Sequence, residues 1–197
     1  MSDAELRPST PSLQIMAMPA LRQFTIEDLE AIPEDGNRYE LLHGVLLVTP
    51  QAGLPHQTVA MRLAVALGSF LRDEPGVEVW GPGAVQLRPS THLEPDLLVG
   101  RMPASPHWDA VEDHWLAVEV SGKGSRIYDR DYKRDGYLAL GVREVWLVDL
   151  DLQQVLVTRP DTEKDVPHAL HLTWRSPAGR DLRIEIPALF RGLPRGD

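Results

Sequence analysis

The stretch at residues 115–149, WLAVEVSGKGSRIYDRDYKRDGYLALGVREVWLVD, decides which fold this chain can adopt. The apolar runs at its two ends predict buried strands, and the segment between them predicts a glycine-bearing turn and a basic helix. One carboxylate, Glu119, interrupts the first apolar run, and Lys133 lies on the predicted helix. The stretch therefore predicts a strand–helix–strand unit that carries an acid and a lysine.

The segments around this unit alternate between helical and strand patterns. Thr25 caps a short predicted helix, a hairpin turns at His43-Gly44, and apolar residues at helical spacing predict a long helix over Leu54–Leu71. Further strands are predicted at Val77–Trp80, Ala84–Leu87, Leu93–Val99, Gln153–Arg159, His168–Trp174 and Leu182–Ile186. This order predicts an α/β fold with a central mixed β-sheet flanked by helices and additional antiparallel strands at the C-terminal end.

Length and composition favour one domain in a reducing compartment. Within 197 residues we expect a leader without fixed structure over 1–20, a single domain over 21–190 and a tail over 191–197. The absence of cysteine excludes disulfides, thiolate zinc sites and a cysteine nucleophile. No apolar run reaches the roughly 20 residues that span a bilayer, and no secretory signal precedes the domain. We therefore expect a cytoplasmic protein with no membrane partner.

The charge distribution is uneven. A net charge of −9 argues against indiscriminate nucleic-acid binding. A local basic stripe nevertheless lies between Ser121 and Arg134, and it consists of Lys123, Arg126, Arg130, Lys133 and Arg134. Such a stripe can meet a phosphate backbone, with a divalent metal offsetting nearby acids, so we expect Lys123, Arg126 and Arg130 to contact a substrate.

Two carboxylates are candidates for a metal site. Alternate side chains of a strand share a face, so Glu119 lies opposite the apolar Leu116, Val118 and Val120. Asp96 opens another predicted strand and lies off its apolar face. If the two strands are adjacent, both carboxylates converge, and they repel each other unless a cation such as Mg²⁺ or Mn²⁺ binds. Such a metal can polarise a phosphoryl oxygen and activate water, as in a phosphodiesterase.

Each residue also has a structural alternative. Asp96 can be a strand-start acid after a proline, and Glu119 must be exposed or paired because burying an isolated carboxylate is costly. An ion pair with Asp129, four residues earlier and worth only about 0.3–0.5 kcal/mol, would explain Lys133. Lys123 is a rival lysine that lies nearer to Glu119 in the sequence.

Several short motifs follow one another along the chain. They are Tyr39-Glu40-Leu41 with Gly44, Pro55-His56, Pro95-Asp96, Val118-Glu119-Val120-Ser121, Asp129, Lys133, Tyr137, Gly141-Val142 and Trp146-Leu147-Val148-Asp149. In their order and spacing the sequence resembles the Uma family of restriction-endonuclease-like proteins, within the PD-(D/E)XK nuclease superfamily. The resemblance covers roughly Thr25 to Arg159, which is most of the chain.

The resemblance implies a metal-dependent endonuclease that acts on DNA. Asp96 and Glu119 would hold Mg²⁺ or Mn²⁺, with the carbonyl of Val120 as a further ligand. The usual motif places a lysine two residues after the glutamate, but that position is Ser121 here. The resemblance therefore moves the lysine role to Lys133.

The resemblance also implies that Glu40 is an additional acid and that His56 is a histidine near the site. The chain departs from the family at 122–125, where family members carry a proline and a hydroxyl residue. Here the segment reads GKGS, with Ser125 as the candidate hydroxyl.

Three functions remain open from the sequence. The first is a Mg²⁺-dependent endonuclease on DNA. The second is a module for nucleic-acid or protein binding that keeps the fold without turnover, which the acidic charge and the departure at 122–125 favour. The third is a hydrolase of RNA or nucleotides. Exposed late strands offer pairing edges, so we also expect a homodimer.

Overall fold

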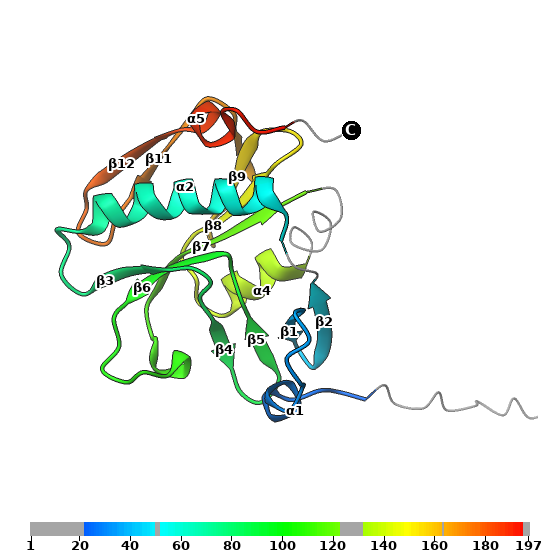
Figure 1. Ribbon diagram of the computed structural model, residues 1–197. Helices are drawn as coiled ribbons and strands as arrows, with labels where there is room; N and C mark the ends of the chain where they lie inside the picture. Colours follow the sequence, from blue (N-terminus) through cyan, green and yellow to red (C-terminus); the bar gives the residue numbers. More distant parts are fainter. Residues whose placement is uncertain (1–21, 50–51, 123–131, 163, 195–197) are drawn as a thin grey trace, which may run out of the picture.

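A computed structural model describes residues 22–49, 52–122, 132–162 and 164–194. Within these ranges the strands form three sheets (Figure 1). The six-stranded sheet contains β3 (Val77–Trp80), β6 (Leu97–Arg101), β7 (His114–Ser121), β8 (Val145–Asp149), β9 (Gln154–Thr158) and β10 (Val166–His168). The four-stranded sheet contains β1 (Arg38–Leu42), β2 (Val45–Thr49), β4 (Val85–Leu87) and β5 (Thr91–Leu93), and a separate hairpin contains β11 (His171–Arg175) and β12 (Asp181–Glu185).

The central sheet is mixed, as expected from the sequence. Its strand order is β10-β9-β8-β7-β6-β3, with β7 and β8 parallel and the other neighbours antiparallel. The parallel pair is the strand–helix–strand unit of residues 115–149. The C-terminal strands are antiparallel, and they extend the edge of this sheet through β9 and β10 or pair with each other in β11 and β12. The α/β fold class is therefore confirmed.

The helices α2 (Leu54–Leu71) and α4 (Arg134–Ala139) lie on opposite faces of the central sheet (Figure 1). The others are α1 (Ile26–Glu30), the 3₁₀ helix η1 (Trp108–Ala110) and α5 (Ile186–Phe190). One core joins α2, α5 and the β11–β12 hairpin to the face of β7 that carries Leu116, Val118 and Val120. A second core joins α4 and the β1–β2 hairpin to the face that carries Ala117. Glu119 has the parity of Ala117 and so belongs to the second face.

Local sequence signals for the first elements are confirmed. Thr25 and Asp28 form a reciprocal capping box at α1. His43 and Gly44 both have positive φ, at 50° and 81°, as a two-residue hairpin turn of the primed type requires. The long helix α2 has the predicted bounds, with a proline in its first turn.

Two predicted strands are wrong because each is divided in the structure. Leu93–Val99 separates into β5, which ends at Leu93, and β6, which begins at Leu97. Pro95 lies between them and has no N–H to donate to a ladder, so the chain leaves one sheet there and enters the other. His168–Trp174 divides in the same way, because β10 pairs with β9 whereas β11 pairs with β12.

Only the C-terminal part of the predicted basic helix falls within the described residues. Lys133 occupies the N-cap position of α4, which runs from Arg134 to Ala139. Residues 123–131 lie outside the described residues, and they include Lys123, Ser125, Arg126, Asp129 and Arg130. Most of the predicted turn and of the basic stripe therefore falls outside them. In the part of the chain that is described, no helix is long and apolar enough to cross a membrane.

Candidate active site

The pairing of β6 with β7 brings the two predicted carboxylates together. Leu98 pairs with Ala117 and Leu97 pairs with Val118. One step further along this antiparallel register, Asp96 lies opposite Glu119. The backbone N–H of Val120 donates to Oδ2 of Asp96 at 2.8 Å. Asp96 thus lies where the chain passes from the four-stranded sheet to the six-stranded sheet, and its side chain lies beside β7.

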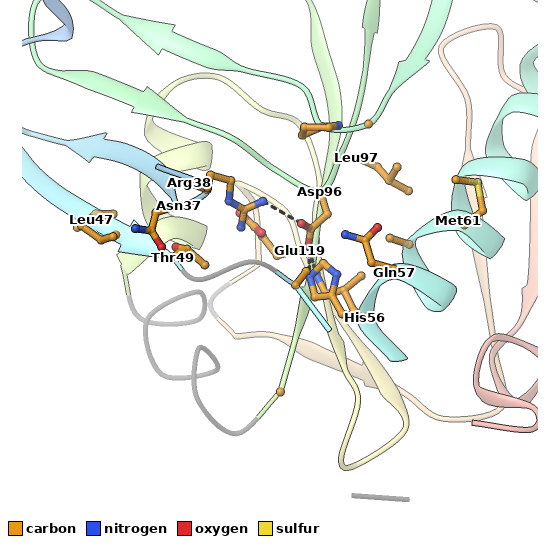
Figure 2. A pocket seen from close by; sticks show the side chains of 18 of the residues that line it. Asn37, Arg38, Leu47, Thr49, His56, Gln57, Met61, Asp96, Leu97 and Glu119 are labelled. Carbon is orange, nitrogen blue, oxygen red and sulfur yellow. Dashed lines mark hydrogen bonds and ion pairs between the residues drawn. The ribbon is translucent and has the colours of Figure 1, made fainter. Parts of the chain in front are cut away.

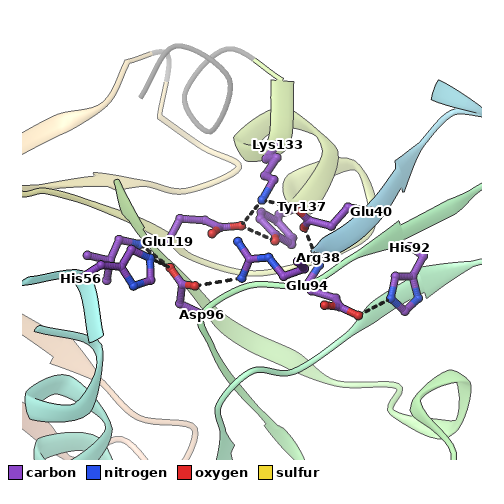
Figure 3. Close-up of polar contacts among 10 residues, drawn as sticks. Arg38, Glu40, His56, His92, Glu94, Asp96, Glu119, Lys133 and Tyr137 are labelled. Carbon is purple, nitrogen blue, oxygen red and sulfur yellow. Dashed lines mark hydrogen bonds and ion pairs between the residues drawn. The ribbon is translucent and has the colours of Figure 1, made fainter. Parts of the chain in front are cut away.

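Asp96 is buried and surrounded by donors (Figure 3). Arg38, the first residue of β1, donates from Nη1 to Oδ1 at 3.0 Å. Nε2 of His56, in the first turn of α2, lies 2.9 Å from Oδ2. Burial by itself raises the pKa of Asp96, but His56, the Val120 amide and Arg38 together outweigh burial and lower that pKa below its ordinary value. The Asp96 carboxylate is therefore held in its ionised form.

Arg38 faces several acids at once. Burial lowers the pKa of its guanidinium, but the carboxylates of Glu119, Glu40 and Asp96 oppose this effect and leave the pKa above its ordinary value. Its positive charge is therefore permanent.

A second group of charges lies on the α4 side of Glu119. We call Glu40, Glu119, Lys133 and Tyr137 the buried quartet. Nζ of Lys133 lies 2.5 Å from Oε2 of Glu40 and 3.2 Å from Oε1 of Glu119. The hydroxyl of Tyr137 donates to the same Oε1 of Glu119 at 2.6 Å, and the backbone N–H of Glu94 donates to Oε1 of Glu40 at 2.7 Å. All four members of the quartet are at most 2% exposed.

The protonation state of Tyr137 follows from this environment. Burial, followed by the charges of Glu119 and Glu40, raises the pKa of the Tyr137 hydroxyl well above its ordinary value. Tyr137 therefore remains a neutral hydrogen-bond donor to Glu119 at any physiological pH.

A glycine lets α4 come close enough to form the quartet. A Cβ on Gly136 would lie 2.9 Å from Cδ1 of Leu42 and 3.1 Å from Cδ1 of Leu93. A larger residue would push the helix away from β1 and β5. Lys133 and Tyr137 are four residues apart, so both point from one side of this closely packed segment toward Glu119.

A cleft of about 980 Å³ opens between the β1–β2 hairpin and the first half of α2 (Figure 2). Its polar side consists of Asn37, Arg38, Thr49, His56, Gln57, Asp96 and Glu119, and Val120 and Gly122 also line it. Its apolar walls consist of Val45, Leu46, Leu47, Val48, Ala60, Met61, Ala64 and Leu97. Arg38 is the one arginine or lysine among the described residues that line the cleft, whereas Glu40, Lys133 and Tyr137 lie outside it.

The structure thus gathers all the predicted site residues that it describes. Asp96, Glu119, Val120 and His56 line one cleft, and Glu40 and Lys133 lie directly behind Glu119. Glu119 is buried and paired, which is one of the two states expected from the sequence.

Sequence reasoning missed the roles of two residues. Arg38 is two residues before Glu40 on β1, so strand alternation could have placed both near the site. Tyr137 is four residues after Lys133, and helical spacing could have placed its hydroxyl beside that lysine.

The donor set fits a divalent cation with few protein ligands. Among the described residues no group of three or more acidic or histidine side chains is arranged to hold a metal. Mg²⁺, however, commonly takes only one or two carboxylates from a protein and completes its shell with water and substrate phosphate. Asp96 and Glu119 line the same cleft. The Val120 N–H points toward Asp96, and in a strand the carbonyl of the same residue points to the same side.

These features define a mixed α/β protein whose cleft carries two carboxylates, one directly before β6 and one in β7. The sequence model of the Uma2 family, described as "Putative restriction endonuclease", matches residues 26–186, and the chain belongs to this family. The fold is similar to the crystal structure of "a putative nuclease belonging to DUF820" from Anabaena variabilis ATCC 29413, with a TM-score of 0.66. That likeness covers 85% of this chain and 97% of the other at 17% identity, so it concerns the fold alone. A search of curated protein sequences gives no significant match.

Proposed function

We propose that this protein is a metal-dependent endonuclease that hydrolyses phosphodiester bonds of DNA. Asp96, Glu119 and the Val120 carbonyl would hold Mg²⁺ or Mn²⁺. The observation that carries the proposal is the placement of Asp96 and Glu119 on one cleft, with Asp96 held ionised by its neighbours. Membership of a family described as restriction endonucleases supports DNA as the substrate.

A divalent cation in this position supplies a Lewis acid and a water of lowered pKa. The protein's own residues supply the orientation of the ligands. The Val120 amide and His56 fix the Asp96 carboxylate, while Tyr137 and Lys133 fix Glu119. Because Lys133 is enclosed, it acts through Glu119, which it contacts, and it adds positive charge behind the site.

Glu40 and His56 have different supporting roles. Glu40 is buried, and the amide of Glu94 and the ammonium group of Lys133 fix its carboxylate, so it positions that lysine. His56 lines the cleft, where it can hold a proton on Nε2 against Asp96. In our proposal the basic residues Lys123, Arg126 and Arg130 add contacts to the DNA backbone.

Cleavage assays test the proposal directly. Purified protein is incubated with supercoiled plasmid, linear duplex, single-stranded DNA and RNA in Mg²⁺ or Mn²⁺, alongside Asp96→Asn. Loss of a metal ligand should slow cleavage about 100-fold or more, because the Lewis acid contributes several kcal/mol to the transition state. Asp181→Asn, an exposed aspartate of β12, is the matched control and should cut at the wild-type rate.

Two results would contradict the proposal. One is that no DNA substrate is cut in either metal, and the other is that Asp96→Asn cuts as fast as wild type. Faster cutting of RNA than of DNA would instead support the third function considered from the sequence.

A second candidate is a binding module without turnover. The observation in its favour is that protein donors already contact both oxygens of Asp96. Calorimetric titration with Mn²⁺ separates the two, because the binding module predicts no binding below millimolar concentration. A homodimer and a cytoplasmic location remain predictions, and light scattering tests the first of these.

A further inference from the structure

Arg38 has an unusual position among the charges of the site. Its side chain is 25% exposed and lines the cleft, whereas Lys133 is only 2% exposed and lies outside it. Its guanidinium donates one hydrogen bond, to Oδ1 of Asp96, and its other N–H groups have no partner in the described part of the chain. Arg38 is therefore the cation best placed to reach a molecule in the cleft.

The two oxygens of Asp96 are not equally occupied. A carboxylate oxygen accepts about two hydrogen bonds. Oδ2 already meets the Val120 N–H and Nε2 of His56, whereas Oδ1 meets Arg38 alone. A cation that binds Asp96 therefore has room at Oδ1, which places it directly beside the guanidinium of Arg38.

A divalent cation at Oδ1 of Asp96 and the guanidinium of Arg38 repel each other strongly in this partly buried site. The Val120 amide is fixed in the backbone of β7, and Lys133 is enclosed by Glu40 and Glu119. Arg38 is the donor that can move, because its long side chain borders the open cleft. The fork of its N–H groups matches the paired oxygens of a phosphate.

We propose that Arg38 is a displaceable counter-ion: it neutralises Asp96 until a divalent cation binds there, and it then contacts a non-bridging oxygen of the substrate phosphodiester. This inference rests on the proposed function, since it assumes that Asp96 is a metal ligand. The proposed role of Arg38 predicts an effect that a purely structural role would not. Arg38 weakens metal binding and strengthens phosphate binding, so its removal changes the two affinities in opposite directions.

The first arm of the test measures Mn²⁺ affinity by titration calorimetry on the full chain without DNA. Arg38→Met keeps the length of the side chain and removes its charge. We expect it to bind Mn²⁺ about ten-fold more tightly than wild type, since a competing charge is lost. Arg38→Lys keeps the charge and should stay close to wild type. Arg183→Met, on the remote strand β12, removes one charge elsewhere and should leave the affinity unchanged.

The second arm measures binding of a short fluorescein-labelled DNA duplex by anisotropy, with Ca²⁺ in place of Mg²⁺. Arg38→Met should bind it about ten-fold less tightly, and the slope of log affinity against log salt should fall by about one. Arg38→Lys should keep the salt slope, and Arg183→Met should match wild type. Thermal melts of all variants establish that they are folded.

The outcomes separate this inference from the function on which it rests. Tighter Mn²⁺ binding together with weaker DNA binding in Arg38→Met supports it. Unchanged or weaker Mn²⁺ binding overturns it, as does an unchanged DNA affinity, while the proposed function stands. If wild type itself binds no Mn²⁺, both the inference and the proposed function fail.

Discussion

Two groups of charged side chains meet at Glu119, and they differ in their access to water. On the cleft side, Asp96 is paired with Arg38 and His56, and the arginine is partly exposed. On the α4 side, Lys133 is enclosed between Glu40 and Glu119. Both groups consist of acids and a cation at similar distances. The comparison teaches that burial, and not residue type, decides which cation can act on a substrate.

Burial also decides how much each pair contributes to stability. Removing one partner of a buried ion pair leaves an uncompensated charge and costs about 3–5 kcal/mol. Arg38 is partly exposed, and Asp96 keeps the Val120 amide and His56 as partners when Arg38 is removed. Loss of the cation from the buried quartet should therefore cost more stability than loss of Arg38.

The largest effect should come from Lys133→Met. This variant removes the ammonium group that contacts both buried carboxylates, Glu40 and Glu119. We expect the free energy of unfolding, measured by urea denaturation, to fall by about 3–5 kcal/mol. Arg38→Met should lower it by less, because the Val120 amide and His56 still contact Asp96.

A double variant serves as the control for this difference. Glu40→Gln combined with Lys133→Met removes a buried charge together with its partner, so it should recover part of the lost stability. Equal destabilisation by Lys133→Met and Arg38→Met would contradict the difference in stability that we expect between the two groups.

An effect of intermediate size is expected for Tyr137→Phe. The variant removes only the hydroxyl that donates to Glu119, and a buried hydrogen bond to a charged group is worth about 1.5–3 kcal/mol. Tyr39 offers a matched control, because its hydroxyl donates to Asp35 at the same 2.6 Å but at the surface. Urea denaturation should show a clearly smaller change for Tyr39→Phe. Similar losses for the two variants would contradict the role that we assign to burial.

Local sequence patterns predict many of the helices and turns. The capping residue Thr25, the turn at His43-Gly44 and the helical spacing of Leu54–Leu71 predicted their elements, because each depends on neighbouring residues. The division at Pro95 was missed, although Glu94-Pro95-Asp96 interrupts the apolar residues there, because the two halves pair with different sheets. Partner choice depends on contacts between distant segments, which periodicity does not encode.

The candidate site also combines features that local patterns predict with features that depend on contacts between distant segments. Parity placed Glu119 on the correct face of its strand, and the adjacency of β6 and β7 then brought Asp96 beside it. No local pattern could show that Arg38, from another sheet, donates to Asp96. Nor could it show that Gly136 lets α4 approach closely enough to bury Lys133. These features arise from the packing of one sheet and one helix against the end of β7.

The smallest effect concerns His114, a buried histidine. His114 begins β7, and its Nε2 has no hydrogen-bond partner in the described part of the chain. Burial lowers the pKa of His114, and the nearby Asp113 opposes this only in part. The unfolded chain therefore binds a proton more readily, so stability is fully present above about pH 6.5 and is lost as the pH falls below it.

His114→Gln tests this prediction. Between about pH 7.5 and pH 5.5 the variant should lose less free energy of unfolding than wild type, by at most about 1.4 kcal/mol per pH unit. Urea denaturation at the two pH values measures the difference. An equal or steeper loss in the variant would contradict the effect that we assign to the burial of His114.

The central claim is that Asp96 and Glu119 together bind a divalent cation. The most direct measurement is a crystal structure grown with Mn²⁺, in which anomalous scattering locates the metal. We predict one anomalous peak about 2.0–2.3 Å from carboxylate oxygens of both Asp96 and Glu119, with Arg38 moved away from Asp96. No peak between the two carboxylates, with Arg38 and His56 still bound to Asp96, would contradict the account.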